Sequence, residues 1–193
     1  MAGVAEAHAV NLAGKYLTFR LVDEEYGLEI LKVREIIGLL PITCLPRTPP
    51  FVRGVINLRG KVIPVIDLRK KFELDVTDDT DQTCIIVVDV TGESGTIQVG
   101  ILVDSVSEVL DIRGEDIEEA PAFGASVDTA FILGMAKAKG GVKILLNIEK
   151  VLSPSDLESF KYRKGDERRQ GAETINHDDR RDGSDRRSDD MDM

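Results

Sequence analysis

One pattern of 19 residues occurs twice in this chain and limits its fold more than any other feature. The sequence GVINLRGKVIPVIDLRKKF at 54–72 returns in altered form as GMAKAKGGVKILLNIEKVL at 134–152, which is 80 positions later. Glycines, which accept positive φ, flank a polar tip in each copy, and Val, Ile and Leu, which suit a half-buried strand, follow. Each copy therefore predicts two strands joined by a tight turn. The equivalent positions include Gly54 and Gly134, Gly60 and Gly140, Val62 and Val142, and Asp67 and Asn147.

A shorter pattern precedes each copy of this hairpin. The run Tyr26-Gly27-Leu28 corresponds to Val99-Gly100-Ile101, which is 73 positions later. Unrelated hairpins can share short patterns by chance, but the same order of anchors in both halves favours duplication. We interpret the chain as two related units in tandem, each too small to be stable alone, and expect them to pack together. The further equivalent pairs are Val33 with Val106, Glu35 with Glu108, and Ile36 with Val109.

The chain is expected to divide into five parts, with a mainly β body. Residues 1–14 are small and mixed and predict a flexible N-terminus. The first β unit is expected at about 15–82 and the second at about 83–152. A short helix at 153–164 and a disordered, charged tail at 165–193 follow.

The start of the expected C-terminal helix has a recognisable signature. Ser153 is a suitable N-cap, and Pro154 suits the first helical position because it needs no amide donor there. Leu157 and Phe160 share one helical face and are expected to anchor the helix on the body. From residue 165 onward the sequence has few large apolar residues and repeats Asp-Arg-Arg, so it cannot bury enough surface to offset its ordering entropy.

The sequence does not predict regular secondary structure for two segments of the first unit. The apolar spacing of 33–37 fits either a bulged strand or one helical turn, and the residues alone do not decide between them. The segment 39–50 contains four prolines and cannot form a regular strand ladder. We expect Thr48 to cap a single helical turn, with Pro49 in its first position and Gly54 at its end.

Charge and composition exclude several classes of partner. The net charge of −10 argues against nucleic acid, which attracts basic surfaces. No run of 18 apolar residues occurs, so we expect no membrane insertion. Cys44 and Cys84 stand apart without metal or redox spacing, which favours free thiols in a reducing cytoplasm.

The sequence also has few residues in arrangements that are typical of catalytic sites. The only histidines, His8 and His177, lie in the expected N-terminal segment and tail, so the body lacks histidine bases and histidine metal ligands. No phosphate-binding loop is present, and we expect neither a cofactor nor a metal. Glu35, Asp67 and Asp104 leave a carboxylate-based enzyme as an alternative, but the equivalent of Asp67 is an asparagine, which favours a structural hydrogen-bonding role there. We therefore expect a non-enzymatic protein.

The remaining signal indicates recognition of a partner. Arg59 lies at an expected hairpin tip, and Glu35 interrupts an apolar pattern. An ion pair between them would border an apolar groove, and such grooves commonly accept a helix. The expected apolar walls are Val33, Ile36, Val106 and Val109.

These motifs resemble the CheW family of bacterial chemotaxis adaptors over about 15–152. The most specific resemblance is Asn57-Leu58-Arg59-Gly60 followed by Pro64-Val65-Ile66-Asp67-Leu68. The runs Glu25-Tyr26-Gly27-Leu28 and Val33-Arg34-Glu35-Ile36 add to it. The second hairpin has Ala136-Lys137-Ala138-Lys139 in place of the Asn-Leu-Arg-Gly motif, which is usual for the second half of the family.

The resemblance implies two five-stranded SH3-like β-barrels packed side by side and no enzymatic activity. It implies a cytoplasmic adaptor, recruited to membrane-associated arrays, that couples the cytoplasmic tip of methyl-accepting chemotaxis receptors to the regulatory domain of the histidine kinase CheA. Ring contacts between adaptor copies also fit this reading. A CheW-like adaptor for surface motility or a second-messenger pathway remains the alternative.

The resemblance also assigns two binding surfaces. The implied receptor groove consists of Val33, Glu35, Ile36, Arg59, Val106, Val109 and Gly134. The kinase-facing surface is implied on the first barrel and is placed only loosely, near Pro46, Pro50, Gly54 and Asn57.

Overall fold

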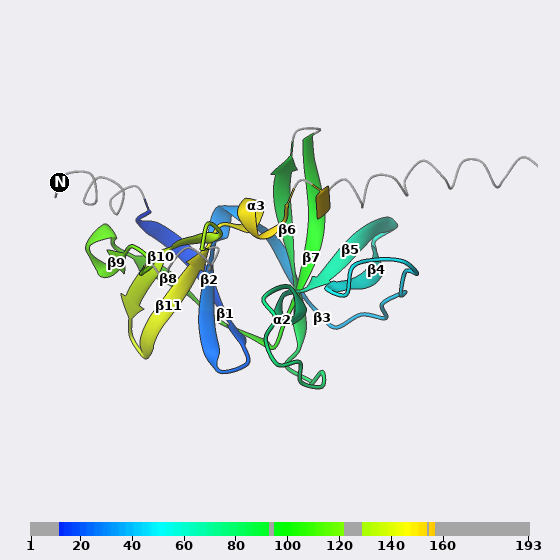
Figure 1. Ribbon diagram of the computed structural model, residues 1–193, viewed down its shortest axis with the longest axis horizontal. Coiled ribbons are helices and arrows are strands. Elements are labelled where there is room, and N and C mark those ends of the chain that lie inside the picture. The colour runs from blue at the N-terminus through cyan, green and yellow to red at the C-terminus, as the bar shows by residue number, and fades with distance from the viewer. Residues whose placement is uncertain (1–11, 93–94, 122–128, 154, 157–193) are drawn as a thin grey trace, which may run out of the picture.

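The computed structural model describes residues 12–92, 95–121, 129–153 and 155–156. Nearly all of its regular structure is β (Figure 1). The strands are β1 (Gly14–Leu21), β2 (Glu24–Glu29), β3 (Val33–Gly38), β4 (Val52–Leu58), β5 (Lys61–Asp67), β6 (Cys84–Gly92), β7 (Gly95–Val103), β8 (Ser105–Ile112), β9 (Ile117–Glu118), β10 (Ile132–Ala138) and β11 (Gly141–Leu146). The helical turns are η1 (Ile30–Lys32), α2 (Leu68–Lys71), η2 (Gly114–Asp116) and α3 (Ile148–Val151).

The strands form two sheets that lie side by side (Figure 1). Sheet A has the order β8-β1-β2-β11-β10-β9, and sheet B has the order β3-β6-β7-β5-β4. Neighbouring strands pair antiparallel except for β2 with β11 and β5 with β7, which pair parallel. The mainly β fold with two packed units is therefore confirmed, although the short β9 gives sheet A six strands rather than five.

The division of the chain between the sheets differs from the expected boundary at 82/83. The chain forms β1 and β2 in sheet A, crosses at η1, forms β3 to β7 in sheet B, and crosses back at Asp104. Sheet B is therefore continuous over 33–103, whereas sheet A combines 14–29 with 105–146. The physical reason is that each repeat pairs its first hairpin with the strands of the other repeat, so neither repeat forms a sheet alone.

The largest apolar core joins the two sheets. Phe19 and Leu28 from sheet A pack in one cluster with Ile86 and Ile101 from sheet B, and all four side chains are fully buried. A column of stacked rings crosses the same region, with centroid separations of 5.1 to 5.9 Å. Its members are Phe19, Tyr26, Phe72 and Phe131. Burial of apolar area is the main stabilising contribution in folding, so the shared core makes the two sheets one folded unit.

The local features expected around the first hairpin are mostly present. Gly54 and Gly60 both have positive φ, at 145° and 84°, as the sequence predicts. The segment 33–37 is a strand with a register shift between Val33 and Glu35, and a single 3-10 turn precedes it. This resolves the open alternative in favour of the bulged strand.

The expected helical turn before Gly54 is wrong. Thr48 donates its hydroxyl to the Leu45 carbonyl instead of capping a helix, and the Val52 amide donates to the Pro49 carbonyl to close a single turn before β4. Pairing of Thr43 with Val55 holds the proline-rich segment against β4, and Gly54 lies within that strand rather than at the end of a helical turn.

Gly54 is required by this contact, and its replacement tests the packing. A Cβ at Gly54 would lie 2.2 Å from the Thr43 carbonyl oxygen. We expect Gly54→Ala to lower the free energy of unfolding by about 1–3 kcal/mol through overpacking alone, with a further penalty from its positive φ. Gly38→Ala is the control, because a Cβ there meets no atom within 4 Å. Urea denaturation should show a loss for Gly54→Ala only, and equal losses would contradict this account.

The C-terminal segment begins with the expected cap. The Asp156 amide donates to the Ser153 hydroxyl, and the Ser153 amide donates to the Asp156 carboxylate, which is a reciprocal capping arrangement. Lys71 of α2 also donates to Asp156 at 2.8 Å and lies 4.0 Å from the centre of the Phe51 ring. Burial favours the neutral form of Asp156, but the hydrogen bonds from Lys71 and Ser153 outweigh it and lower its pKa. The expected anchors Leu157 and Phe160, the expected N-terminal segment 1–11 and the tail lie outside the described residues.

The lowered pKa makes the contribution of Asp156 dependent on pH. Its folded-state pKa lies below the ordinary value of 3.8, so the stabilisation is complete above pH 3.8 and is lost as the pH falls through the folded-state pKa. We expect Asp156→Asn to cost about 1 kcal/mol at neutral pH, the typical value of a helix cap. Thermal melts of both proteins should converge as the pH falls below 3.8. A difference that stays constant at acidic pH would show that the charge of Asp156 is irrelevant.

Candidate partner-binding site

The predicted ion pair between Glu35 and Arg59 is present. Two guanidinium nitrogens of Arg59 donate to the two carboxylate oxygens of Glu35 at 2.9 and 2.8 Å. The Arg59 side chain is 75% exposed and that of Glu35 is 27% exposed. The hydrogen bonds from Arg59 to Glu35 and their opposite charges raise the pKa of Arg59. The paired geometry fixes the direction of both side chains at the surface.

The local backbone presents Arg59 at the tip of the β4–β5 hairpin. Arg59 itself has a φ of 51°, a left-handed conformation that is uncommon for residues other than glycine. The Asn57 side chain accepts a hydrogen bond from the Gly60 amide at 2.8 Å and so closes the turn. Glu35 lies on β3, at the opposite edge of sheet B from β4, so sheet order alone does not make them neighbours.

The four apolar groove residues divide into two pairs. Val33 and Val106 are partly buried and pack against the shared core. Ile36 and Val109 are exposed, by 45% and 49%, on the edge strands β3 and β8. Ile36 and Val109 are thus exposed at equivalent places on the two sheets, whereas Val33 and Val106 are only partly exposed. The lining of one groove by all four stays a prediction.

Gly134 was expected at the edge of the groove. It is buried in β10, where a Cβ would lie 2.7 Å from Ile117 and 3.0 Å from the Glu118 carbonyl oxygen. The glycine therefore allows β9 to approach β10. This packing requirement accounts for Gly134 without an exposed role at the edge of a groove.

The four residues placed loosely on the kinase-facing surface do not form one cluster. Pro46 and Pro50 are exposed in the segment before β4, whereas Asn57 lies near the far end of that strand. At about 3.3 Å per residue, the strand separates its two ends by roughly 20 Å. Gly54 is buried and contributes only backbone geometry.

Sequence reasoning missed Arg69, a fully buried charged residue. The Arg69 side chain has no exposed surface, and each of its five N–H donors has an acceptor. The hydrogen bonds to Asp67, with smaller contributions from the charges of Asp67 and Asp104 and the bond to Asp79, outweigh the effect of burial and raise the pKa of Arg69. A charged residue two positions after Asp67, the end of an apolar strand, was the available signal. The acceptors are Asp67 (two bonds), Asp79, Asp104 and the Thr77 carbonyl.

The three carboxylates considered for acid–base chemistry are all held by arginines. Glu35 binds Arg59, whereas Asp67 and Asp104 bind Arg69. Asp67 also accepts from the Arg69 amide as the N-cap of α2, and Asn147 caps α3 in the same way, which confirms the structural role expected from their equivalence. Among the described residues, no group of three His, Cys, Asp or Glu side chains could hold a metal ion.

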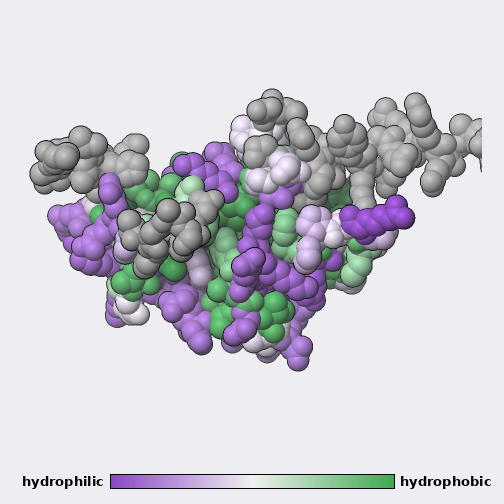
Figure 2. Space-filling model, viewed as in Figure 1, coloured by the Kyte–Doolittle hydropathy of each residue, from purple (hydrophilic) through white to green (hydrophobic). Residues whose placement is uncertain are grey.

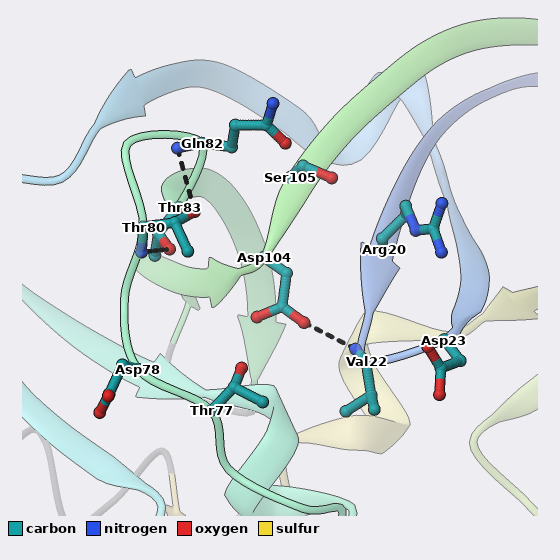
Figure 3. A pocket seen from close by; sticks show the side chains of 10 residues that line it. All are labelled: Arg20, Val22, Asp23, Thr77, Asp78, Thr80, Gln82, Thr83, Asp104 and Ser105. Atoms are coloured by element: carbon teal, nitrogen blue, oxygen red, sulfur yellow. Dashed lines mark hydrogen bonds between the residues drawn. The ribbon is translucent and has the colours of Figure 1, made fainter.

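The pocket shown in Figure 3 lies where the two sheets meet, and most of the residues that line it are polar or charged. Its volume is about 380 Å³, and Asp104 stands between the loop of Thr77–Thr83 and the β1–β2 turn. Its lining consists of Arg20, Val22, Asp23, Thr77, Asp78, Thr80, Gln82, Thr83, Asp104 and Ser105. In Figure 2, hydrophobic residues form small separate patches among hydrophilic ones, so this face of the molecule lacks a single large apolar surface. In the part of the chain described, no helix is long and apolar enough to cross a membrane.

The described residues thus form two interleaved β-sheets with an exposed ion pair between Glu35 and Arg59. Comparison with known proteins gives the family. The CheW-like domain matches residues 15–155, which is most of the chain, so the chain belongs to the CheW family. This is a family of non-enzymatic scaffold proteins.

Several relatives support this assignment. The chain is 38% identical over 157 residues to the chemotaxis protein CheW of Klebsiella aerogenes, covering 81% of this chain and 92% of the relative. It is 31% identical over 140 residues to Protein FrzA of Myxococcus xanthus, covering 72% and 84%. The crystal structure of the scaffolding protein TtCheW from Thermoanaerobacter tengcongensis is similar, with a TM-score of 0.66, 36% identity and coverage of 75% and 96%.

Replacement of Arg59 by alanine and replacement of Arg69 by alanine should have different effects on the stability of the fold. Arg59→Ala should leave the melting temperature within about 2 °C of the unmodified protein, because exposed ion pairs add little to stability. Arg69→Ala should cost about 3–5 kcal/mol, because it leaves buried carboxylates without their partner. Thermal and urea denaturation of both variants measure this contrast. A large loss of stability for Arg59→Ala would assign a structural role to the exposed pair.

Proposed function

We propose that this protein couples methyl-accepting chemotaxis receptors to the histidine kinase CheA without chemistry of its own. The observation that carries the proposal is the exposed Glu35–Arg59 pair on a domain of the CheW family. A two-bond pair at the surface fixes a charge pattern but adds little to fold stability, which suits orientation of a partner. The relatives named as chemotaxis proteins support the same role.

The proposed receptor surface combines this pair with the exposed apolar residues Ile36 and Val109. One belongs to each sheet, so a helical receptor tip could contact both edges and bury them. Val33 and Val106 support the two edges from beneath through the shared core. Burial of a few apolar side chains beside a fixed charge pair is a usual arrangement for specific binding.

The proposed kinase surface lies beside sheet B, in the segment before β4 where Pro46 and Pro50 are exposed. Asn57 belongs to the Arg59 hairpin, so we assign it to support of the ion pair instead. Contacts between adaptor copies in a ring, and a cytoplasmic location at membrane-associated receptor arrays, follow from the same proposal.

A parallel chemosensory pathway is the second candidate function. The similarity to Protein FrzA supports it, because that relative bears a name different from the chemotaxis protein CheW. Pull-down of the full chain against receptor and kinase fragments from each chemosensory system of the same organism separates the two candidates. Selective capture of one receptor–kinase set assigns the pathway.

Reconstitution with receptor and kinase tests the coupling, and Val109→Asp tests the proposed groove. The unmodified protein should raise receptor-dependent kinase phosphorylation and show no ATP hydrolysis alone. Val109→Asp should reduce receptor binding by at least about tenfold, because the added carboxylate must lose its water on binding. Val109 is preferable to Val106 for this test, because Val106 packs against the core.

The matched control is Val62→Asp, which changes an exposed valine on β5. It should leave receptor binding unchanged, and both variants should retain kinase binding and melting temperature. Equal receptor binding by Val109→Asp and the unmodified protein would exclude the proposed groove. Kinase activity that is indifferent to the adaptor would refute the coupling role itself.

A further inference from the structure

In the described residues the chain crosses from one sheet to the other at two places. At each crossing, which we call a joint, a residue of the connecting segment forms an ion pair with a short helix. The first crossing is η1, where Lys32 pairs with Glu149 of α3 at 2.7 Å. The second is Asp104, which pairs with Arg69 of α2 at 2.9 Å. Arg69 and Glu149 are equivalent in the two repeats, 80 positions apart, so the two joints are related but have reversed charges.

The two joints differ in burial and in the number of bonds. The side chains of Lys32 and Glu149 are 35% and 36% exposed, and one bond joins them. Arg69 is fully buried, and Asp104 binds both sheets at once. One oxygen of Asp104 accepts from Arg69 on the sheet B side, and the other accepts from the Val22 amide in the β1–β2 turn of sheet A at 2.6 Å. The amide of Asp104 also donates to the Arg20 carbonyl at 3.1 Å.

The turn that receives this bond is strained. Val22 has a φ of 57°, and a β-branched residue rarely adopts a left-handed conformation. Such a conformation persists only where surrounding contacts determine it. The Asp104 carboxylate supplies such a contact, and Figure 3 shows it directed at Val22 between the loop and the turn. The strain indicates that the joint fixes one arrangement rather than following the sheets passively.

We propose that Asp104, held by Arg69, is a positioning residue that sets the orientation of sheet A relative to sheet B. Asp104 immediately precedes β8, so the same contact sets where Val109 lies relative to Ile36 on β3. The effect on receptor binding rests on the proposed function, whereas the orientation of the sheets does not.

The chemistry of the joint explains why an aspartate is needed. A carboxylate has two accepting oxygens, and here one serves Arg69 and the other serves Val22. Asparagine has the same shape, but one of its terminal atoms is an NH2 donor, which would face a donor in either orientation. Asp104→Asn therefore breaks the bridge without removing volume.

Distance measurement between the sheets tests the proposal directly. Spin labels are attached through Val62→Cys in β5 and Val142→Cys in β11, two exposed and equivalent positions, one in each sheet. The natural thiols are first removed by Cys44→Ser and Cys84→Ala, and the melting temperature of this background is checked. Double electron–electron resonance on the full chain should give one narrow distance distribution.

Asp104→Asn should broaden or shift this distribution in a protein that remains folded by circular dichroism. Glu149→Gln is the matched control, because it makes the same acid-to-amide change at the exposed joint, and it should leave the distribution unchanged. Arg69→Lys is the second variant. Lysine keeps the charge but has three N–H donors in place of five, so this variant should also broaden the distance distribution. If Asp104→Asn does not fold, Arg69→Lys decides the test.

Three results would overturn the proposal. The first is a broad distance distribution in the unmodified protein, and the second is an unchanged distribution in folded Asp104→Asn or in folded Arg69→Lys. The third is a distribution that broadens as much in Glu149→Gln as in Asp104→Asn. Receptor affinity is then measured separately with a cytoplasmic receptor-tip fragment. We expect Asp104→Asn to weaken it by about tenfold, within the usual range of coupling between sites. Broadening with unchanged receptor affinity would uphold the positioning role and count against the proposed receptor groove, so failures of the two are distinguishable.

Discussion

The buried guanidinium of Arg69 is the contact on which the arrangement of this molecule depends. Moving a charge out of water is costly, and only a full set of partners offsets that cost. Arg69 has such a set, because every one of its five donors finds an acceptor and the carboxylates around it neutralise its charge. The described part of the chain has no buried side-chain polar atom without a hydrogen bond. Buried ion pairs often contribute more to a single defined geometry than to net stability.

The exchange of hairpins between the repeats gives this contact its importance. Because each sheet is built from both repeats, the strands described in the structure pass from one sheet to the other at two points, η1 and Asp104. The shared apolar core holds the sheets together, but apolar attraction has little directional preference. Directional hydrogen bonds at Asp104 can supply the orientation that the core leaves open. The apolar core therefore holds the two sheets together, and the ion cluster at Asp104 orients them relative to each other.

Arg69 and Arg59 both pair with carboxylates, but burial gives the two ion pairs different roles. Both guanidinium groups pair with carboxylates at about 3 Å. Water screens the exposed Arg59 pair, so that pair is suited to present charge to a partner. The Arg69 cluster is shielded and belongs to the frame of the fold. The proposed function uses this separation, with the buried cluster in the frame of the fold and the exposed pair proposed to face a partner.

The sequence by itself determined the duplication, the hairpins, the positive φ at Gly54 and Gly60, the Ser153 cap and the Glu35–Arg59 pair. These features depend on local backbone chemistry or, for the ion pair, on family resemblance. Only the tertiary structure decided which strands share a sheet, because the pairing of β2 with β11 and β5 with β7 depends on contacts far apart in the chain. It also packed Val33 and Val106 partly against the shared core and buried Gly134, because the face of a strand follows its register and bulges. The role of Arg69 was hidden for the same reason, since its acceptors Asp79 and Asp104 lie 10 and 35 positions away and meet it only after the sheets have packed.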